Sequence, residues 1–111
     1  MRREDDGAGH RHLRVQSLIR EELEALLRDD VSDPDLAGVR VAAAALSVDY
    51  RHVKVHFVVA TAQAADARRR ALAALERATP FFRARLAEAV EMKRTPELRF
   101  VCDGVVPPDD A

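Results

Sequence analysis

Apolar residues recur at helical spacing over residues 13–28, and polar residues fill the opposite side. This pattern predicts an amphipathic helix that buries one face. Asp33-Pro34 follows it and forbids further helix, because proline disfavours the α conformation at the preceding residue. Residues 1–12 are charged, contain glycine and show no periodicity, so we expect them to form a flexible tail.

Apolar and polar residues alternate in three other segments, as they do in strands with one buried face. The clearest is 53–60, where Val53, Val55, Phe57 and Val59 share one side. Residues 39–48 form a second strand, and the short connection between the two predicts an antiparallel hairpin. Residues 97–103 form a third strand, and we expect residues 104–111 to be a flexible end.

Between the strands predicted at 53–60 and 97–103 lies an alanine-rich helical stretch of about residues 64–93, interrupted by Pro80. Proline inside a helix costs about 3 kcal/mol, but it suits the first position of a new helix. We therefore predict two helices that meet at Ala78-Thr79-Pro80, with Thr79 as N-cap. The order of elements predicts an α+β domain, with a three-stranded sheet and helices on one face.

The chain has 111 residues and a mass of 12.3 kDa, which suggests one domain. Its one cysteine, Cys102, excludes an internal disulfide and a cysteine-based zinc site. No apolar run reaches the roughly 20 residues of a membrane span, and the start does not look like a secretory signal. We expect a cytoplasmic protein without a membrane partner.

The net charge of −1 conceals an uneven distribution. Residues 1–67 sum to −3, residues 68–99 to +5 and residues 100–111 to −3. Salt screens charges beyond about 10 Å, so the basic segment 68–99 can act locally. A neutral total is therefore compatible with a nucleic-acid partner.

No group of residues suggests catalysis. There is no glycine-rich phosphate loop, and no serine lies in a nucleophile motif. His10 and His12 fall in the predicted tail, while His52 and His56 border or lie in a strand rather than share a helix face. We expect no enzyme activity, no metal and no cofactor.

The predicted helix break is the most informative feature. A helix that begins at Pro80 leaves the first backbone N–H groups unpaired, and such an end attracts anions. Arginines surround it, which favours phosphate binding, although an ordinary solvated helix face explains the same residues. The candidate RNA-binding residues are Arg69, Arg70, Arg77, Ala78, Thr79, Pro80, Phe81, Arg83, Arg85, Lys93 and Arg94.

An ordered set of short motifs extends over about residues 13–103. It comprises Arg14-Val15, Glu22-Leu23, Leu26-Leu27, Asp33-Pro34, Leu36, Ser47-Val48-Asp49, Val53, Val55, Val59, Leu75, Ala78, Phe82-Arg83, Leu86, Arg94-Thr95-Pro96-Glu97-Leu98-Arg99-Phe100 and Asp103. With this order and spacing, the chain resembles the ribosome-binding factor A family, bacterial assembly factors for the small ribosomal subunit.

The resemblance implies a type II KH-like domain over residues 13–103, ordered α-β-β-α-kink-α-β around a three-stranded mixed sheet. It implies a non-enzymatic factor that binds the 30S subunit and its 16S rRNA. Such a factor assists late maturation and rRNA processing, supports growth in the cold and is a monomer off the ribosome. Other assembly factors are further expected partners.

The chain departs from the family pattern at two places. Ala78-Thr79-Pro80 stands where the family has Ala-x-Gly, so the break would be kept by proline, which deletes one backbone N–H. The family commonly extends beyond the last strand, whereas this chain stops at Ala111, so functions of that tail are expected to be missing or moved elsewhere.

A second function fits the same fold. The polar sheet face with Arg40, Lys54 and His56, or the acidic first helix, would serve a protein–protein adaptor that does not bind RNA directly.

Overall fold

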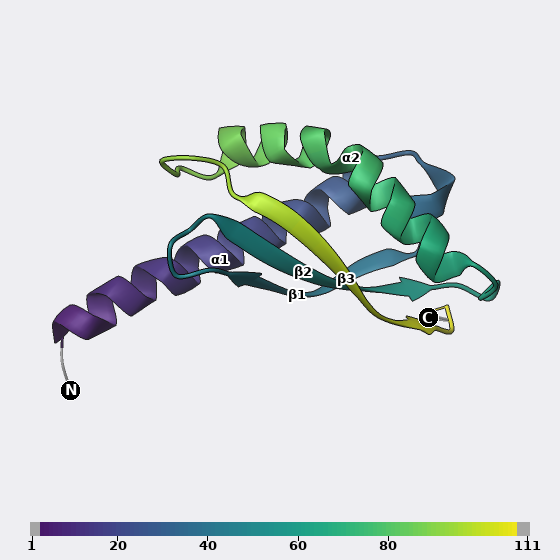
Figure 1. The fold of residues 1–111 in the computed structure, drawn as a ribbon, viewed down its shortest axis with the longest axis horizontal. Coiled ribbons are helices and arrows are strands. Elements are labelled where there is room, and N and C mark those ends of the chain that lie inside the picture. Colours follow the sequence, from purple (N-terminus) through teal and green to yellow (C-terminus); the bar gives the residue numbers. More distant parts are fainter. Residues whose placement is uncertain (1–2, 109–111) are drawn as a thin grey trace.

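One mixed sheet forms the centre of the computed structural model, which describes residues 3–108 and the side chains from residue 9 onward. Its strands are β1 (Val39–Leu46), β2 (His52–Ala60) and β3 (Glu97–Val106), with β2 in the middle. The β1–β2 pair is antiparallel, as the short connection predicts, and β3 runs parallel to β2 (Figure 1).

The core lies against one face of β2. Val53, Val55, Phe57 and Val59 are all at most 5% exposed, whereas Lys54 between them is exposed. The predicted alternation along this strand is therefore confirmed, and the open side of the sheet carries the polar residues.

Two helices, α1 (Arg3–Asp29) and α2 (Ala67–Ala89), supply the rest of the core. From α1, Ile19, Leu23 and Leu26 are at most 1% exposed, and Leu75 and Phe82 of α2 are equally buried. Because only one face of β2 is buried, both helices must cover that face. The α+β architecture predicted from the sequence is confirmed.

Both predicted ends of the domain differ from the structure. Helix α1 begins at Arg3, so residues 3–12 of the expected tail are helical, and residues 1–2 lie outside the described range. His12 Nε2 lies 2.9 Å from the Leu46 carbonyl oxygen, which ties this part of α1 to the sheet. A helix that is already packed extends at little further cost.

Strand β3 also exceeds its prediction, because it continues to Val106 rather than ending at residue 103. Gly104, Val105 and Val106 pair with Val58, Val59 and Ala60 of β2. The Thr61 N–H adds a bond to the Val106 carbonyl at 3.0 Å. Residues 104–106 of the expected flexible end are therefore sheet, and residues 109–111 lie outside the described range.

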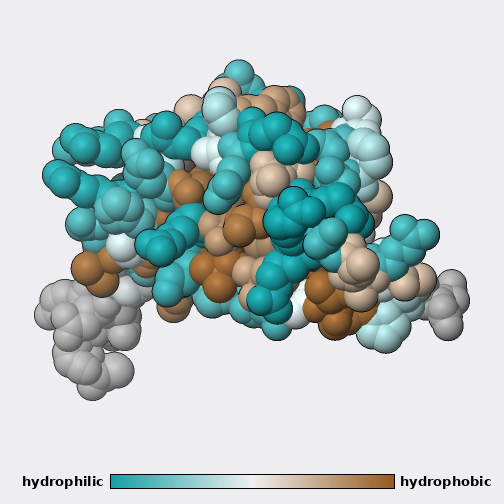
Figure 2. All heavy atoms as spheres, turned by 45° about the vertical axis from the view of Figure 1, so that its right-hand side comes forward, coloured by the Kyte–Doolittle hydropathy of each residue, from teal (hydrophilic) through white to brown (hydrophobic). Residues whose placement is uncertain are grey.

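The surface is mostly hydrophilic on the face shown in Figure 2, and its apolar side chains lie in small separate groups. Within residues 3–108, no helix is long and apolar enough to cross a membrane.

The adjacent residues Phe81 and Phe82 allow a matched test of this core. Phe82 is fully buried, whereas Phe81 is 37% exposed. Phe82→Ala should lower the free energy of unfolding by about 3–5 kcal/mol, because it leaves a cavity. Phe81→Ala should cost about 1 kcal/mol, because less apolar surface is lost. Urea denaturation of both variants measures the difference, and equal losses would contradict the described packing.

Candidate nucleic-acid interface

Pro80 does not start a new helix, because α2 is continuous from Ala67 to Ala89 with Pro80 inside it. Figure 1 shows that the helix axis changes direction near its middle. Thr79 is not an N-cap, since its hydroxyl donates backward to the Leu75 carbonyl at 2.9 Å. Leu75 and Phe82 are buried on either side of the bend. This packing offsets the cost of proline, so the prediction of two helices was wrong.

The continuous helix removes one part of the predicted site. The N–H groups of Phe81, Phe82 and Arg83 lie in the helix interior rather than at a free helix end. The anion site expected from unpaired amides is therefore absent from α2. Of the neighbouring candidates, Ala78 is half-buried against the core, while Pro80 and Phe81 lie at the surface.

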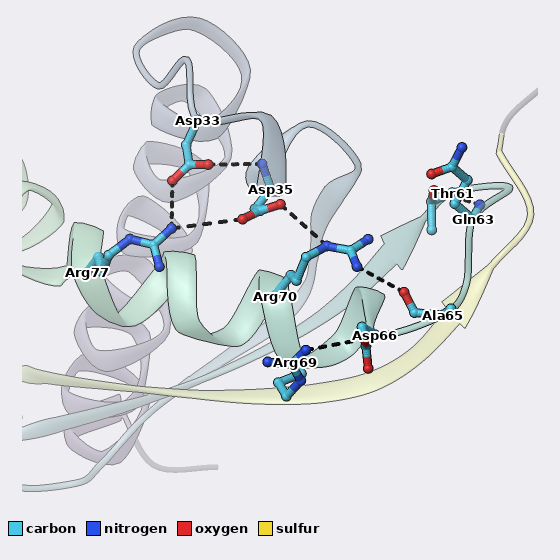
Figure 3. Close-up of polar contacts among 9 residues, drawn as sticks. All are labelled: Asp33, Asp35, Thr61, Gln63, Ala65, Asp66, Arg69, Arg70 and Arg77. Atoms are coloured by element: carbon cyan, nitrogen blue, oxygen red, sulfur yellow. Dashed lines mark hydrogen bonds and ion pairs between the residues drawn. The ribbon is translucent and has the colours of Figure 1, made fainter.

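Arg69, Arg70 and Arg77 form an arginine row along α2, as Figure 3 shows. Arg70 and Arg77 meet carboxylates of the loop after α1, and Arg69 meets Asp66 at the start of α2. Arg77 Nη2 lies 3.0 Å from Asp33 Oδ2 and 4.0 Å from Asp35 Oδ2. Arg70 Nε lies 3.5 Å from Asp35 Oδ1, and Arg69 Nη2 lies 3.3 Å from Asp66 Oδ2. These arginines remain largely exposed, but each one faces a negative charge.

A short 3-10 helix, η1 (Pro34–Leu36), holds these carboxylates in place. Asp33 is its N-cap, and the Asp33 carboxylate accepts the Asp35 N–H at 2.9 Å. This N–H and, second, the Arg77 guanidinium hold the pKa of Asp33 below its usual value. Capping and ion pairing therefore share one carboxylate.

The two arginines after the bend have different roles. Arg85 lies 3.4 Å from Asp30 and places its guanidinium carbon 5.7 Å from the ring centre of Phe81. Arg83 donates from Nε to the Pro96 carbonyl at 3.0 Å and from Nη2 to the Thr95 carbonyl at 2.9 Å. Arg83 thus fixes the approach to β3, and two of the five N–H donors of its guanidinium are used for this structural role.

Lys93 and Arg94 lie apart from the arginine row, in the loop after α2. Both are exposed, and among the described residues neither makes an ion pair. They line a cleft together with Arg11, Tyr50 and Arg51. The structure therefore divides the predicted site into two regions, and it adds Arg11, Tyr50 and Arg51 from two separate segments that no periodicity or spacing indicated.

Comparison with known proteins identifies the family. The family model described as Ribosome-binding factor A matches residues 11–108. The chain belongs to the ribosome-binding factor A family. A family member from Heliobacterium modesticaldum is 41% identical over 96 residues, which cover 86% of this chain and 78% of that relative. The family consists of non-enzymatic assembly factors, and the resemblance seen in the sequence is confirmed.

Solved structures of this family share the fold. The crystal structure of ribosome-binding factor A from Thermus thermophilus is 30% identical, with a TM-score of 0.63. The match covers 85% of this chain and 92% of that one. Coordinates of a Thermus thermophilus homology model, fitted into a cryo-EM map of a 30S–ribosome-binding factor A complex, match with a TM-score of 0.58 and 30% identity. This match covers 84% of this chain and 91% of that one. The KH-like fold expected from the resemblance is therefore confirmed.

Arg83 should behave as a structural residue. Arg83→Gln removes two charge-assisted hydrogen bonds to backbone carbonyls, each worth about 1.5–3 kcal/mol. We expect a loss of about 3 kcal/mol or more in the free energy of unfolding, measured by urea denaturation. Arg69→Gln, which loses only an exposed ion pair, should cost less than about 0.5 kcal/mol. Equal effects would show that Arg83 does not hold the loop.

We expect the Asp33 carboxylate to make the free energy of unfolding depend on pH. Its pKa is lowered in the folded protein, so its contribution is present above the unfolded value of about 4. That contribution is lost as pH falls through the lower folded pKa. Asn in Asp33→Asn still caps η1 but carries no charge. Urea unfolding should show the variant less stable than wild type near pH 6, with the gap closing below about pH 4. A constant gap would contradict this role.

Proposed function

We propose that the protein binds the small ribosomal subunit through its 16S rRNA, in the cytoplasm, and assists late maturation and rRNA processing. The observation that carries this proposal is family membership, since the family model matches residues 11–108. The similarity to coordinates fitted into a map of a 30S complex supports it. Growth in the cold and a monomeric state off the ribosome belong to the same proposal.

The arginine row of α2 supports contact with the RNA backbone. Arg70 and Arg77 share one face of α2, and Arg69 extends from the neighbouring side (Figure 3). Arginine binds phosphate in a planar, bidentate manner. Exposed ion pairs contribute about 0–1 kcal/mol, so RNA phosphates can displace Asp33 and Asp35 at small cost. The carboxylates then act as competitors, which weaken non-specific contacts to other polyanions.

Neutralising the arginine row tests this contact. The variant Arg69→Gln, Arg70→Gln and Arg77→Gln should reduce co-sedimentation with immature 30S subunits about tenfold, because phosphate contacts are lost. Asp33→Asn with Asp35→Asn should strengthen binding, because it frees Arg70 and Arg77. Arg68→Gln with Arg99→Gln is the control for charge loss elsewhere, with two charges removed against three, since both arginines are exposed and make no ion pair among the described residues.

The outcomes of these experiments distinguish RNA binding from the protein–protein adaptor function. Unchanged co-sedimentation of the folded triple variant would overturn the role of the row. Wild-type protein that fails to sediment with subunits would overturn the proposed function itself. Capture of a protein partner that survives nuclease treatment and high salt would instead support the adaptor on the open sheet face.

A further inference from the structure

A basic cleft lies away from the arginine row, where three segments meet. These are the first half of α1, the turn between β1 and β2, and the loop between α2 and β3; all three lie at the left-hand end in Figure 1. The cleft measures about 420 Å³, which is within the range of sites for small organic ligands. Its lining residues are Arg11, Val15, Asp49, Tyr50, Arg51, Glu91, Met92, Lys93 and Arg94.

The charges of the cleft favour an anionic ligand. Arg11, Arg51, Lys93 and Arg94 line it, and a connected groove that shares Arg11 and Lys93 adds Arg14. Two carboxylates, Asp49 and Glu91, oppose these five cations. Unlike the arginine row, none of the five makes an ion pair with another described residue. The cleft thus gathers several cations whose positive charge remains available.

Asp49 is already committed to the turn that forms one wall. Its Oδ1 accepts the Ser47 hydroxyl at 2.7 Å and the Arg51 N–H at 3.1 Å. These two donors and nearby cations hold the pKa of Asp49 below its usual value. The carboxylate therefore stabilises the loop geometry and keeps its negative charge, so Asp49 and Glu91 together oppose a bound anion against the five cations.

Tyr50 gives the cleft an aromatic wall whose position is fixed. It adopts a left-handed backbone conformation, with φ at 63°, in the turn. The His12 ring meets its ring edge-on at 5.3 Å between centroids, and the Arg11 guanidinium lies 6.0 Å from its centre. His12 Nε2 in turn lies 2.9 Å from the Leu46 carbonyl oxygen. Contacts from α1 and from the β1–β2 turn therefore fix the position of the Tyr50 ring.

Cations beside a fixed aromatic ring match the chemistry of an unpaired nucleotide. Single-stranded RNA offers phosphates to arginine and lysine and an exposed base to an aromatic side chain, whereas a duplex keeps its bases stacked inside. We propose that this cleft binds a single-stranded RNA segment, with phosphates on its cations and one base packed against Tyr50. The identity of the ligand as RNA rests on the proposed function; the location and the single-strand preference are new.

Charge removal tests the location. Lys93→Gln with Arg94→Gln should weaken binding of a fluorescent oligouridylate about tenfold, and should lower the slope of log affinity against log salt by about 1.4. Arg68→Gln with Arg99→Gln removes the same charge elsewhere and should change neither value. Fluorescence anisotropy measures both, and circular dichroism confirms that all variants are folded.

Replacement of the ring tests the base contact. Asn tolerates the left-handed conformation, so Tyr50→Asn removes the ring while the turn is kept. It should weaken oligouridylate binding at least fivefold, and Tyr50→Phe, which keeps the ring, should bind as wild type does. An RNA duplex of equal length should bind more weakly than the single strand and should not respond to Tyr50→Asn.

Each result decides one claim. If wild-type protein sediments with 30S subunits but does not bind oligouridylate, the cleft proposal is overturned and the proposed function stands. The same conclusion follows if the cleft variants bind oligouridylate as the control does, or if the duplex binds as well as the single strand. If wild-type protein binds neither subunits nor RNA, the proposed function itself fails.

Discussion

The central strand β2 buries every second side chain, and the rest of the fold is arranged to cover that apolar strip. Phe57 is completely buried at its centre. An amphipathic helix in a protein gains most of its stability from packing of its apolar face, so both helices depend on this face of β2. The inner side of α2 is used for that packing, and its arginines are consequently left on the outer side. The position of the arginine row thus follows from the core.

The sequence alone predicted those elements whose structure follows from local periodicity. The alternation of Val53, Val55 and Phe57 predicted β2 directly, and the helical spacing of Ile19 and Leu23 predicted the buried face of α1. The true ends of α1 and β3 depend on contacts between distant segments, such as His12 with Leu46, and no local pattern contains them. The extent of the elements was therefore underestimated at both ends.

Pro80 and the charged residues show why the candidate site was predicted only in part. A proline in a helix interior costs about 3 kcal/mol locally, but burial of Leu75 and Phe82 on both sides of the bend outweighs it. Likewise, a count of charges finds the basic segment but not its partners. Arg77 and Asp33 are 44 positions apart and meet only in the folded chain. Whether a cationic side chain is free to bind a ligand therefore depends on the tertiary structure.

The parallel pairing of β3 imposes an order on folding. The antiparallel β1–β2 hairpin involves nearby residues and forms locally, whereas a parallel neighbour requires a long crossover, here the whole of α2. While the chain is being synthesised, one edge of β2 therefore stays unpaired until the last strand has emerged. During that interval the hairpin presents free backbone groups to any other extended chain. Prompt pairing of β3 with β2 is consequently important for yield as well as for stability.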